Sequence, residues 1–200
     1  AGVSVADATT LEGALLVESG AGEIPQLPGF AEGWFSVQDV GAQCVAVLAD
    51  PQPGDVVLDL CSAPGGKACH LGERMDDAGS LIAVELHERK AALIRESAER
   101  LGLSCVHVVS ADATSPAALR EALAAHAPAS AAAGADCIVV DAPCSGTGTL
   151  RRNPEHRYRV EEASRLEGLC ALQDRLLDAA AECVRVGGTI TFSVCSPLRA

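Results

Sequence analysis

The chain is poor in aromatic residues, and this limits how its core can be built. Of 200 residues, 2% are Phe, Trp or Tyr, whereas 48% are hydrophobic. The core must then consist mainly of Val, Leu, Ile and Ala, which suits a parallel sheet wrapped by helices better than a sandwich. No apolar run approaches the ~18 residues of a membrane span, and no signal peptide is visible at the N-terminus. We expect a cytoplasmic protein with no membrane partner.

Basic residues are also scarce. Fifteen Lys and Arg stand against 27 Asp and Glu, which gives a formal net charge of −12. Such a chain does not bind nucleic acid nonspecifically over its surface, because the phosphate backbone repels it. A nucleic-acid substrate therefore requires a local basic patch or a separate domain.

The cysteines lack the spacing of a metal or disulfide framework. The chain has nine of them, an odd number, and no two form a C-x-x-C pair. This pattern favours free thiols in a reducing cytosol over disulfides, and it predicts no metal site.

The chain divides into a short N-terminal part and one domain. Residues 1–35 show no sustained hydrophobic period, and we interpret them as the tail of a preceding module plus a linker. Residues 36–200 form the domain. Ser36 and Asp39 are spaced as a capping box, which predicts an amphipathic helix from there that ends before Pro51.

From residue 55 onward, short β runs alternate with helical segments. The β runs are 56–60, 81–84, 105–109, 137–140 and 189–193, and the helical segments are 66–75, 87–101, 116–126 and 161–184. This alternation predicts an α/β fold with a doubly wound, mostly parallel sheet. The Ala-rich run 124–135 is expected to be a loop rather than a site.

A glycine-containing turn follows the first of these strands. Residues 61–67 read CSAPGGK and lead into a helix. Ligands of open α/β sheets bind beyond the carboxyl ends of the strands, and Gly65 and Gly66 allow backbone to approach a ligand closely. The turn matches neither G-x-G-x-x-G nor the P-loop pattern, which weakens dinucleotide and triphosphate interpretations.

Two acidic residues stand at the ends of the next two strands. Glu85 closes the second strand, where a carboxylate can bind ribose hydroxyls, and Asp112 follows the third, where it can accept from an adenine amino group. Either acid alone is most simply a solvated loop residue. Three loops in the correct order favour a nucleoside cofactor.

Two cysteines follow the last two strands in loop sequence. Cys144 lies in DAPCSGTG at 141–148, and Cys195 lies in FSVCSP at 192–197. A buried structural thiol fits both poorly, although it remains our expectation for four others: Cys105, Cys137, Cys170 and Cys183. Leu150 stands where a cysteine phosphatase requires Arg, and there is no G-x-S-x-G.

Three motifs together carry a family resemblance: DLCSAPGGK at 59–67, DAPCSG at 141–146 and SVCS at 193–196. With these, the chain resembles the Nop/Sun/Fmu family of RNA (cytosine-5) methyltransferases, and most of all the bacterial Sun/Fmu type that acts on small-subunit ribosomal RNA. The likeness runs from about Pro28 to the chain end. It implies a class I methyltransferase fold, S-adenosylmethionine as cofactor and an RNA substrate, with ribosomal RNA favoured and transfer RNA as the alternative.

The resemblance also implies roles for individual residues. Glu85 would bind the ribose, Asp112 the adenine edge, and Asp141 would lie beside both the sulfonium and the target base. Cys195 would attack C6 of cytosine and Cys144 would assist release. The methionine part would be held by Cys61, Ser62, Ala63, Pro64, Gly65, Gly66 and Lys67.

The chain departs from the family pattern in two places. Val194 stands where the family usually has Thr, so a hydroxyl beside the nucleophile is lost. A class I methyltransferase sheet normally continues with an antiparallel hairpin, so we expect that C-terminal strands are missing after Cys195.

A basic cluster lies just beyond Cys144. Its members are Arg151, Arg152, Arg157 and Arg159. An ordinary solvated loop is the simpler interpretation, but the position beside a cytosine-handling loop favours a phosphate-binding patch. Two rival functions stay open: a non-catalytic RNA-binding or assembly factor that keeps the fold, and a class I methyltransferase acting on DNA or a small molecule.

Overall fold

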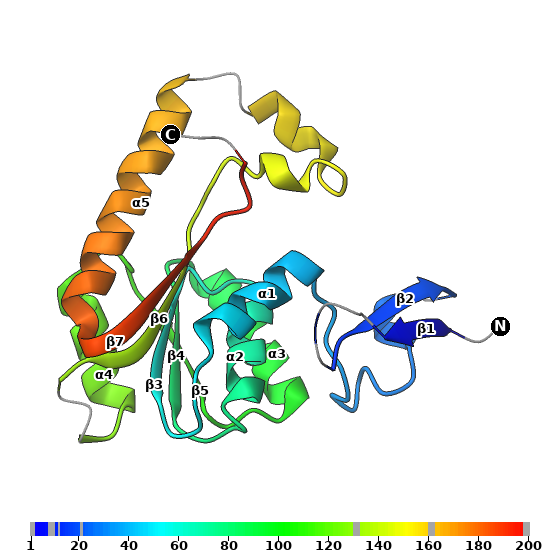
Figure 1. Cartoon of the computed structure of the whole chain (residues 1–200), viewed down its shortest axis with the longest axis horizontal. Helices are drawn as coiled ribbons and strands as arrows, with labels where there is room; N and C mark the ends of the chain where they lie inside the picture. The colour runs from blue at the N-terminus through cyan, green and yellow to red at the C-terminus, as the bar shows by residue number, and fades with distance from the viewer. Residues whose placement is uncertain are drawn as a thin grey trace.

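A five-stranded parallel sheet forms the centre of the molecule (Figure 1). The computed structural model describes residues 3–7, 11, 13–20, 22–129, 133–159 and 163–197. The strands are β3 (Val56–Leu60), β4 (Ser80–Glu85), β5 (Val106–Ser110), β6 (Ala135–Asp141) and β7 (Val184–Ser193), in the order β5-β4-β3-β6-β7. All four pairings are parallel, which confirms the predicted architecture. The strand order reverses at β3, where ligands of such sheets bind.

Helices cover both faces of this sheet. The helices are α1 (Val40–Ala49), α2 (Gly66–Arg74), α3 (Glu88–Leu101), α4 (Pro116–His126) and α5 (Ala163–Cys183). Local sequence explains their ends: Ser115 caps α4 by accepting from the Ala118 amide, and Gly102 ends α3 in the left-handed conformation. The loop expected at 124–135 is shorter, since α4 continues to His126 and β6 begins at Ala135.

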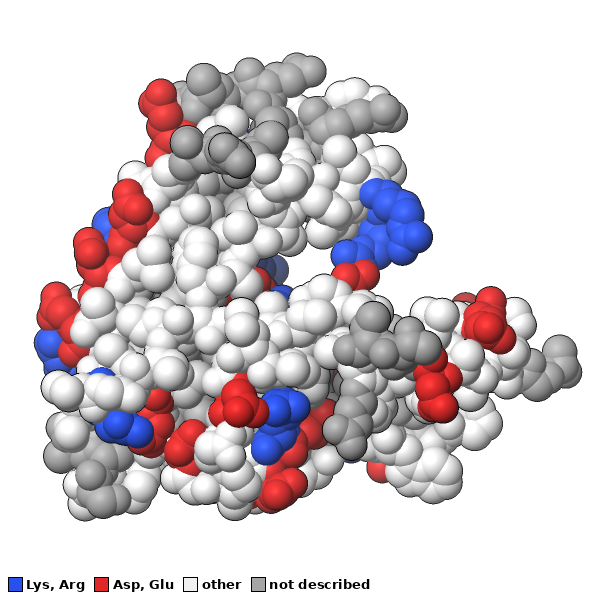
Figure 2. All heavy atoms as spheres, in the orientation of Figure 1, with Lys and Arg blue, Asp and Glu red and all other residues white. Residues whose placement is uncertain are grey.

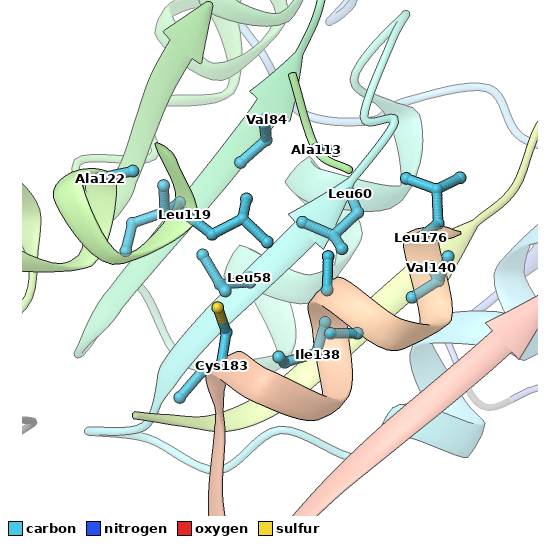
Figure 3. Close-up of a cluster of buried hydrophobic side chains, with 14 of the residues drawn as sticks. Leu58, Leu60, Val84, Ala113, Leu119, Ala122, Ile138, Val140, Leu176 and Cys183 are labelled. Carbon is cyan, nitrogen blue, oxygen red and sulfur yellow. The ribbon is translucent and has the colours of Figure 1, made fainter. Parts of the chain in front are cut away.

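Alternate residues of the strands build two apolar layers. Leu58 and Leu60 pack toward α4 and α5, where Leu119 and Leu176 meet them (Figure 3). Val57, the residue before Leu58, packs on the opposite side of the sheet with Ala46 of α1 and Leu71 of α2. Every residue of β3 and β4 is buried, as expected for central strands with helices on both faces.

The loop after β6 extends away from the sheet. It contains two short 3₁₀ helices, η3 (Thr147–Thr149) and η4 (Pro154–Arg159), before α5 returns along the sheet. Figure 2 shows the molecule hollowed between this projecting segment and the body that contains the sheet. The carboxyl ends of the strands point toward this hollow (Figure 1).

Two N-terminal strands were not anticipated from the sequence. β1 (Ser4–Asp7) pairs antiparallel with β2 (Leu15–Ser19), and η1 (Ile24–Gln26) follows. Nearly all their residues are exposed, so there was no alternation of buried and exposed positions to detect. Further along, Arg100 donates to the carbonyls of Phe30 and Phe35 and lies 4.0 Å over the Phe30 ring, which ties this segment to α3.

The predicted capping box is wrong. The helix begins at Val40, and Asp39 is its N-cap, with Oδ1 accepting from the Gly41 amide at 3.0 Å. The buried residues of α1 are Ala46 and Ala49, whereas the larger Leu48 is 75% exposed. The small alanines allow α1 to approach α2 and the sheet closely, and Asp39 is itself a preferred cap. Within the described ranges, no helix is long and apolar enough to cross a membrane.

Candidate active site

A cleft of about 1160 Å³ runs along the carboxyl edge of the sheet. Most of the site residues predicted from the sequence line it, and they stand at or beyond the carboxyl ends of β3, β4, β5, β6 and β7. They are Cys61, Ala63, Pro64, Lys67, Glu85, Asp112, Asp141, Cys144, Arg152 and Cys195. This volume is slightly above the range of about 300–1,000 Å³ that is typical of small-molecule sites.

The turn at 61–67 borders one end of the cleft: Cys61, Ala63, Pro64 and Lys67 line it, whereas Gly65 and Gly66 do not. Gly65 has a φ of +105°, and a Cβ there would lie 3.0 Å from the Cα of Ile94, so both conformation and packing require glycine. No side chain caps the N-terminus of α2, which begins at Gly66. Its first amide groups can therefore bind an anionic group such as a carboxylate. Ser62 is buried beneath the turn rather than in the cleft wall.

Glu85 and Asp112 hold carboxylates at the same end of the cleft. Glu85 is only 6% exposed, and its Oε1 accepts from the His87 amide at 3.0 Å. Asp112 is exposed, and its Oδ1 accepts from the amide and hydroxyl of Thr114 at 2.9 and 2.8 Å. These two hydrogen bonds lower the pKa of Asp112. The two acids thus stand at and just beyond the carboxyl ends of the neighbouring strands β4 and β5.

Asp141 lies at the centre of the cleft with both carboxylate oxygens in use. Lys67 Nζ is 2.7 Å from Oδ2, and the hydroxyl of Ser193 donates to Oδ1 at 2.8 Å. Neither contact was predicted from the sequence, which assigned Lys67 to the cofactor-binding turn only. The strand register contained the signal for one of them, because Asp141 of β6 stands opposite Ser193 of β7.

Cys144 and Cys195 meet beside Asp141. Their sulfur atoms are 2.9 Å apart, and both residues are free thiols. Burial, the hydrogen bond and charge of Cys144 and the charge of Asp141 together raise the pKa of Cys195 to about 11. Cys195 is thus a thiol at neutral pH in this state, and it must lose its proton to act as a nucleophile.

The remaining cysteines are mostly in the core. Cys105, Cys137 and Cys183 are buried, as expected for structural thiols, and Cys170 is half-buried. The described residues hold no group of three or more His, Cys, Asp or Glu placed to bind a metal ion.

A fully buried acid lies directly beneath the cleft. Asp59 is on β3 with no exposed surface, and Ser62 Oγ donates to its Oδ2. Within the described part of the chain, its Oδ1 has no hydrogen-bond partner. Burial raises the pKa of Asp59 to about 7; the Ser62 hydrogen bond opposes this, Asp141 adds to it and Lys67 reduces it. Sequence reasoning gave this residue no role.

The basic cluster is only partly free to bind an anion. Arg151 is exposed, whereas the guanidinium of Arg152 donates to Oδ2 of Asp39 and so links the projecting segment to the N-terminus of α1. Arg157 and Arg159 belong to η4, and their side chains lie outside the described residues.

Comparison with known proteins decides the family. The family described as 16S rRNA methyltransferase RsmB/F matches residues 46–200. The chain belongs to this family. The recognition made from the three motifs is thereby confirmed.

Relatives of this RsmB/F-family chain are longer than it is. A probable ribosomal RNA small subunit methyltransferase B of Synechocystis sp. is 41% identical over 175 residues, which are 88% of this chain and 37% of the relative. Ribosomal RNA small subunit methyltransferase B of Vibrio cholerae is 35% identical, over 98% of this chain and 42% of its own length. The chain therefore spans about two fifths of the curated relatives that it matches.

Solved structures confirm the fold of the RsmB/F-family domain. The protein PH0851 has a TM-score of 0.84 at 30% identity, covering 98% of this chain and 41% of its own. NSun6 from Pyrococcus horikoshii, solved with SFG, has a TM-score of 0.74 at 26% identity, covering 87% of this chain and 41% of its own. The predicted class I methyltransferase architecture is thus confirmed.

Proposed function

We propose that this chain carries the catalytic domain, residues 36–200, of an enzyme that transfers a methyl group from S-adenosylmethionine to C5 of a cytosine in small-subunit ribosomal RNA. The observation that carries the proposal is the pair of thiols 2.9 Å apart, beside an aspartate bound by Lys67 and Ser193. A merely RNA-binding descendant of the fold would have no need to keep both thiols in the cleft. Family membership supports the ribosomal substrate.

The cleft fits S-adenosylmethionine at its glycine-turn end. Glu85 would bind the ribose hydroxyls, Asp112 the adenine amino group, and the uncapped start of α2 the methionine carboxylate. SFG, bound in the archaeal NSun6 structure, is an analogue of this cofactor. When bound, S-adenosylmethionine supplies an electrophilic methyl group.

Cytosine requires help before it can accept that methyl group. C5 becomes nucleophilic when a thiolate adds to C6, so one difficult step is divided into two. We assign the addition to Cys195. The Cys195 thiol gives up its proton as its sulfur adds to C6, and N3 gains one. We assign to Asp141, which lines the same cleft, the transfer of this proton to N3 and its removal once C5 is methylated.

The later half of the reaction needs a second group. After methyl transfer, C5 must lose its proton and the bond between C6 and Cys195 must break. Cys144 lies 2.9 Å from Cys195 and so can take the C5 proton while Cys195 leaves as a thiolate. The target base must also leave its stack to reach the two sulfurs, and we assign the adjoining phosphates to the basic cluster beyond Cys144.

Single cysteine variants of the complete protein test these assignments. With RNA and S-adenosylmethionine, Cys144→Ala should attack and methylate but fail to release, leaving an RNA–protein adduct that survives denaturing electrophoresis. Cys195→Ala and the double variant should form no adduct and no 5-methylcytosine. Cys44→Ala, at an exposed cysteine of α1, is the matched control and should behave as wild type.

The outcomes separate the competing functions. An adduct with Cys195→Ala and none with Cys144→Ala would assign the attack to Cys144, the arrangement of DNA cytosine-5 enzymes. Full activity of both variants would refute covalent catalysis by these thiols. Mapping 5-methylcytosine in ribosomal and transfer RNA, with and without the protein, identifies the substrate.

A further inference from the structure

Three hydroxyl groups join the two cysteine loops behind the sulfur atoms. The Oγ of Ser145 lies 2.7 Å from that of Ser196, and the Oγ1 of Thr147 lies 3.1 and 3.2 Å from these two atoms. Ser145 follows Cys144 in the chain, and Ser196 follows Cys195. We propose that this hydroxyl cluster, Ser145, Thr147 and Ser196, is a positioning device that sets the distance between the two thiols. The proposal rests on the proposed function only for its catalytic consequence.

The backbone around the cluster shows that the loops are built as one unit. The Gly148 amide donates to the Cys195 carbonyl at 2.9 Å, and a Cβ at Gly148 would lie 2.8 Å from that carbonyl oxygen. Only glycine therefore allows the loops to approach this closely. Nearer the sheet, the Ala142 amide donates to the Ser193 carbonyl at 3.0 Å. The sequence motifs CSG and VCS are thus two halves of a single structural element.

The position of the cluster argues for an indirect role. Ser145 and Thr147 are half-buried and do not line the cleft, so two of the three hydroxyls lie behind its wall. Both cysteines stand beyond the last ladder bonds of β6 and β7, where the sheet no longer aligns them. Cross-loop bonds must supply that alignment, and small errors in the placement of reacting groups are costly in rate.

A chemical measurement of thiol proximity tests the proposal without RNA or cofactor. One thiolate of the pair attacks oxidised glutathione, forming a mixed disulfide and releasing one glutathione. The second thiolate then displaces the other glutathione and closes the Cys144–Cys195 disulfide. The rate of this closure, followed by acid quenching, alkylation and peptide mass spectrometry, reports how well the protein holds the two sulfurs together.

The variants remove the hydroxyls and then restore them. We expect closure to slow about tenfold when Ser145→Ala, Thr147→Val and Ser196→Ala are combined, since three weak neutral hydrogen bonds are lost together. Ser145→Thr and Ser196→Thr keep a hydroxyl and should close at close to the wild-type rate. Ser104→Ala removes an exposed serine hydroxyl far from the cleft, bonded to Asp77, and is the matched control.

Each outcome bears on the proposal. Unchanged closure in a folded triple variant would overturn it, as would equal slowing by the Thr substitutions. If the triple variant does not fold, Thr147→Val alone, which keeps the side-chain shape, replaces it under the same criterion. In the methylation assay the same variants should lower kcat with little change in KM for RNA. If the triple variant closes the disulfide slowly but the wild-type protein does not methylate RNA, the proposed function is refuted and the positioning role stands.

Discussion

Replacing Asp59 by Asn should change how the stability of the protein depends on pH. The carboxyl is fully buried on β3, and its pKa is raised to about 7 from the ordinary value of 3.8. The folded state therefore binds a proton that the unfolded state releases between about pH 4 and pH 7. Stability from this group is present below pH 4 and is lost as pH rises toward 7, because ionising the buried carboxyl is unfavourable.

The size of the effect follows from the two pKa values. They differ by about three pH units, and each unit corresponds to about 1.4 kcal/mol, so about 4 kcal/mol of wild-type stability disappears across the window. Asn has the same shape, and its side-chain oxygen can accept from Ser62, but it does not titrate. Its amide adds a buried donor that costs about 1–3 kcal/mol at every pH. The informative quantity is therefore how the difference in the free energy of unfolding between wild type and Asp59→Asn depends on pH.

Urea unfolding of both proteins at a series of pH values from 4 to 8 measures this difference. The free energy of unfolding of wild type should fall relative to Asp59→Asn by about 1.4 kcal/mol per pH unit below pH 7. Asp178→Asn, at an exposed position on α5, is the control and should show no such trend. A constant difference between pH 4 and pH 8 would refute the reasoning, since Asp59 would then keep one protonation state throughout.

Three further predictions concern the cleft. Because the pKa of Cys195 is raised to about 11, its alkylation by iodoacetamide in the ligand-free protein should accelerate with pH up to at least pH 10. Asp141→Asn should shift this pH profile to lower pH. A plateau of the alkylation rate below pH 8 would contradict the raised pKa. S-adenosylhomocysteine should raise Tm by mass action, and Asp112→Ala should weaken its binding in calorimetry without unfolding the domain; binding of NADH or ATP instead would overturn the cofactor assignment. Replacing four arginines by Ala should weaken RNA binding and flatten its salt dependence, because each phosphate contact releases counterions. Cofactor affinity should stay unchanged. An unaltered salt slope would show that these arginines belong to a solvated loop that does not contact phosphate. These arginines are Arg151, Arg152, Arg157 and Arg159.

The elements of the sheet were predictable from local sequence, and the contacts between them were only partly so. Strands β3 and β4 are short, apolar and bounded by turn residues, so their positions could be read directly. The loops after the strands were identified because all parallel strands end at one edge. The exposed pair β1 and β2 has no buried face and therefore no period to detect.

Interactions between distant residues were beyond the sequence. Lys67 and Asp141 are 74 positions apart, and their ion pair depends on how α2 is oriented over the sheet. Asp59 was visible inside a motif, but its burial follows from packing on both faces of β3. The capping box failed because two plausible caps stood three residues apart, and pattern alone could not choose between them.

The position of β3 divides the domain into two half-sheets that present different groups to the cleft. In the described sheet, β3 alone is hydrogen-bonded to both β4 and β6. The half formed with β4 and β5 presents Glu85 and Asp112, and the half formed with β6 and β7 presents the two thiols. The halves are also consecutive in the chain, so each can accept insertions or substitutions in its loops without altering the other. Such a fold can keep the groups of one half while the other acquires a different chemistry, provided that the register of a single strand is preserved.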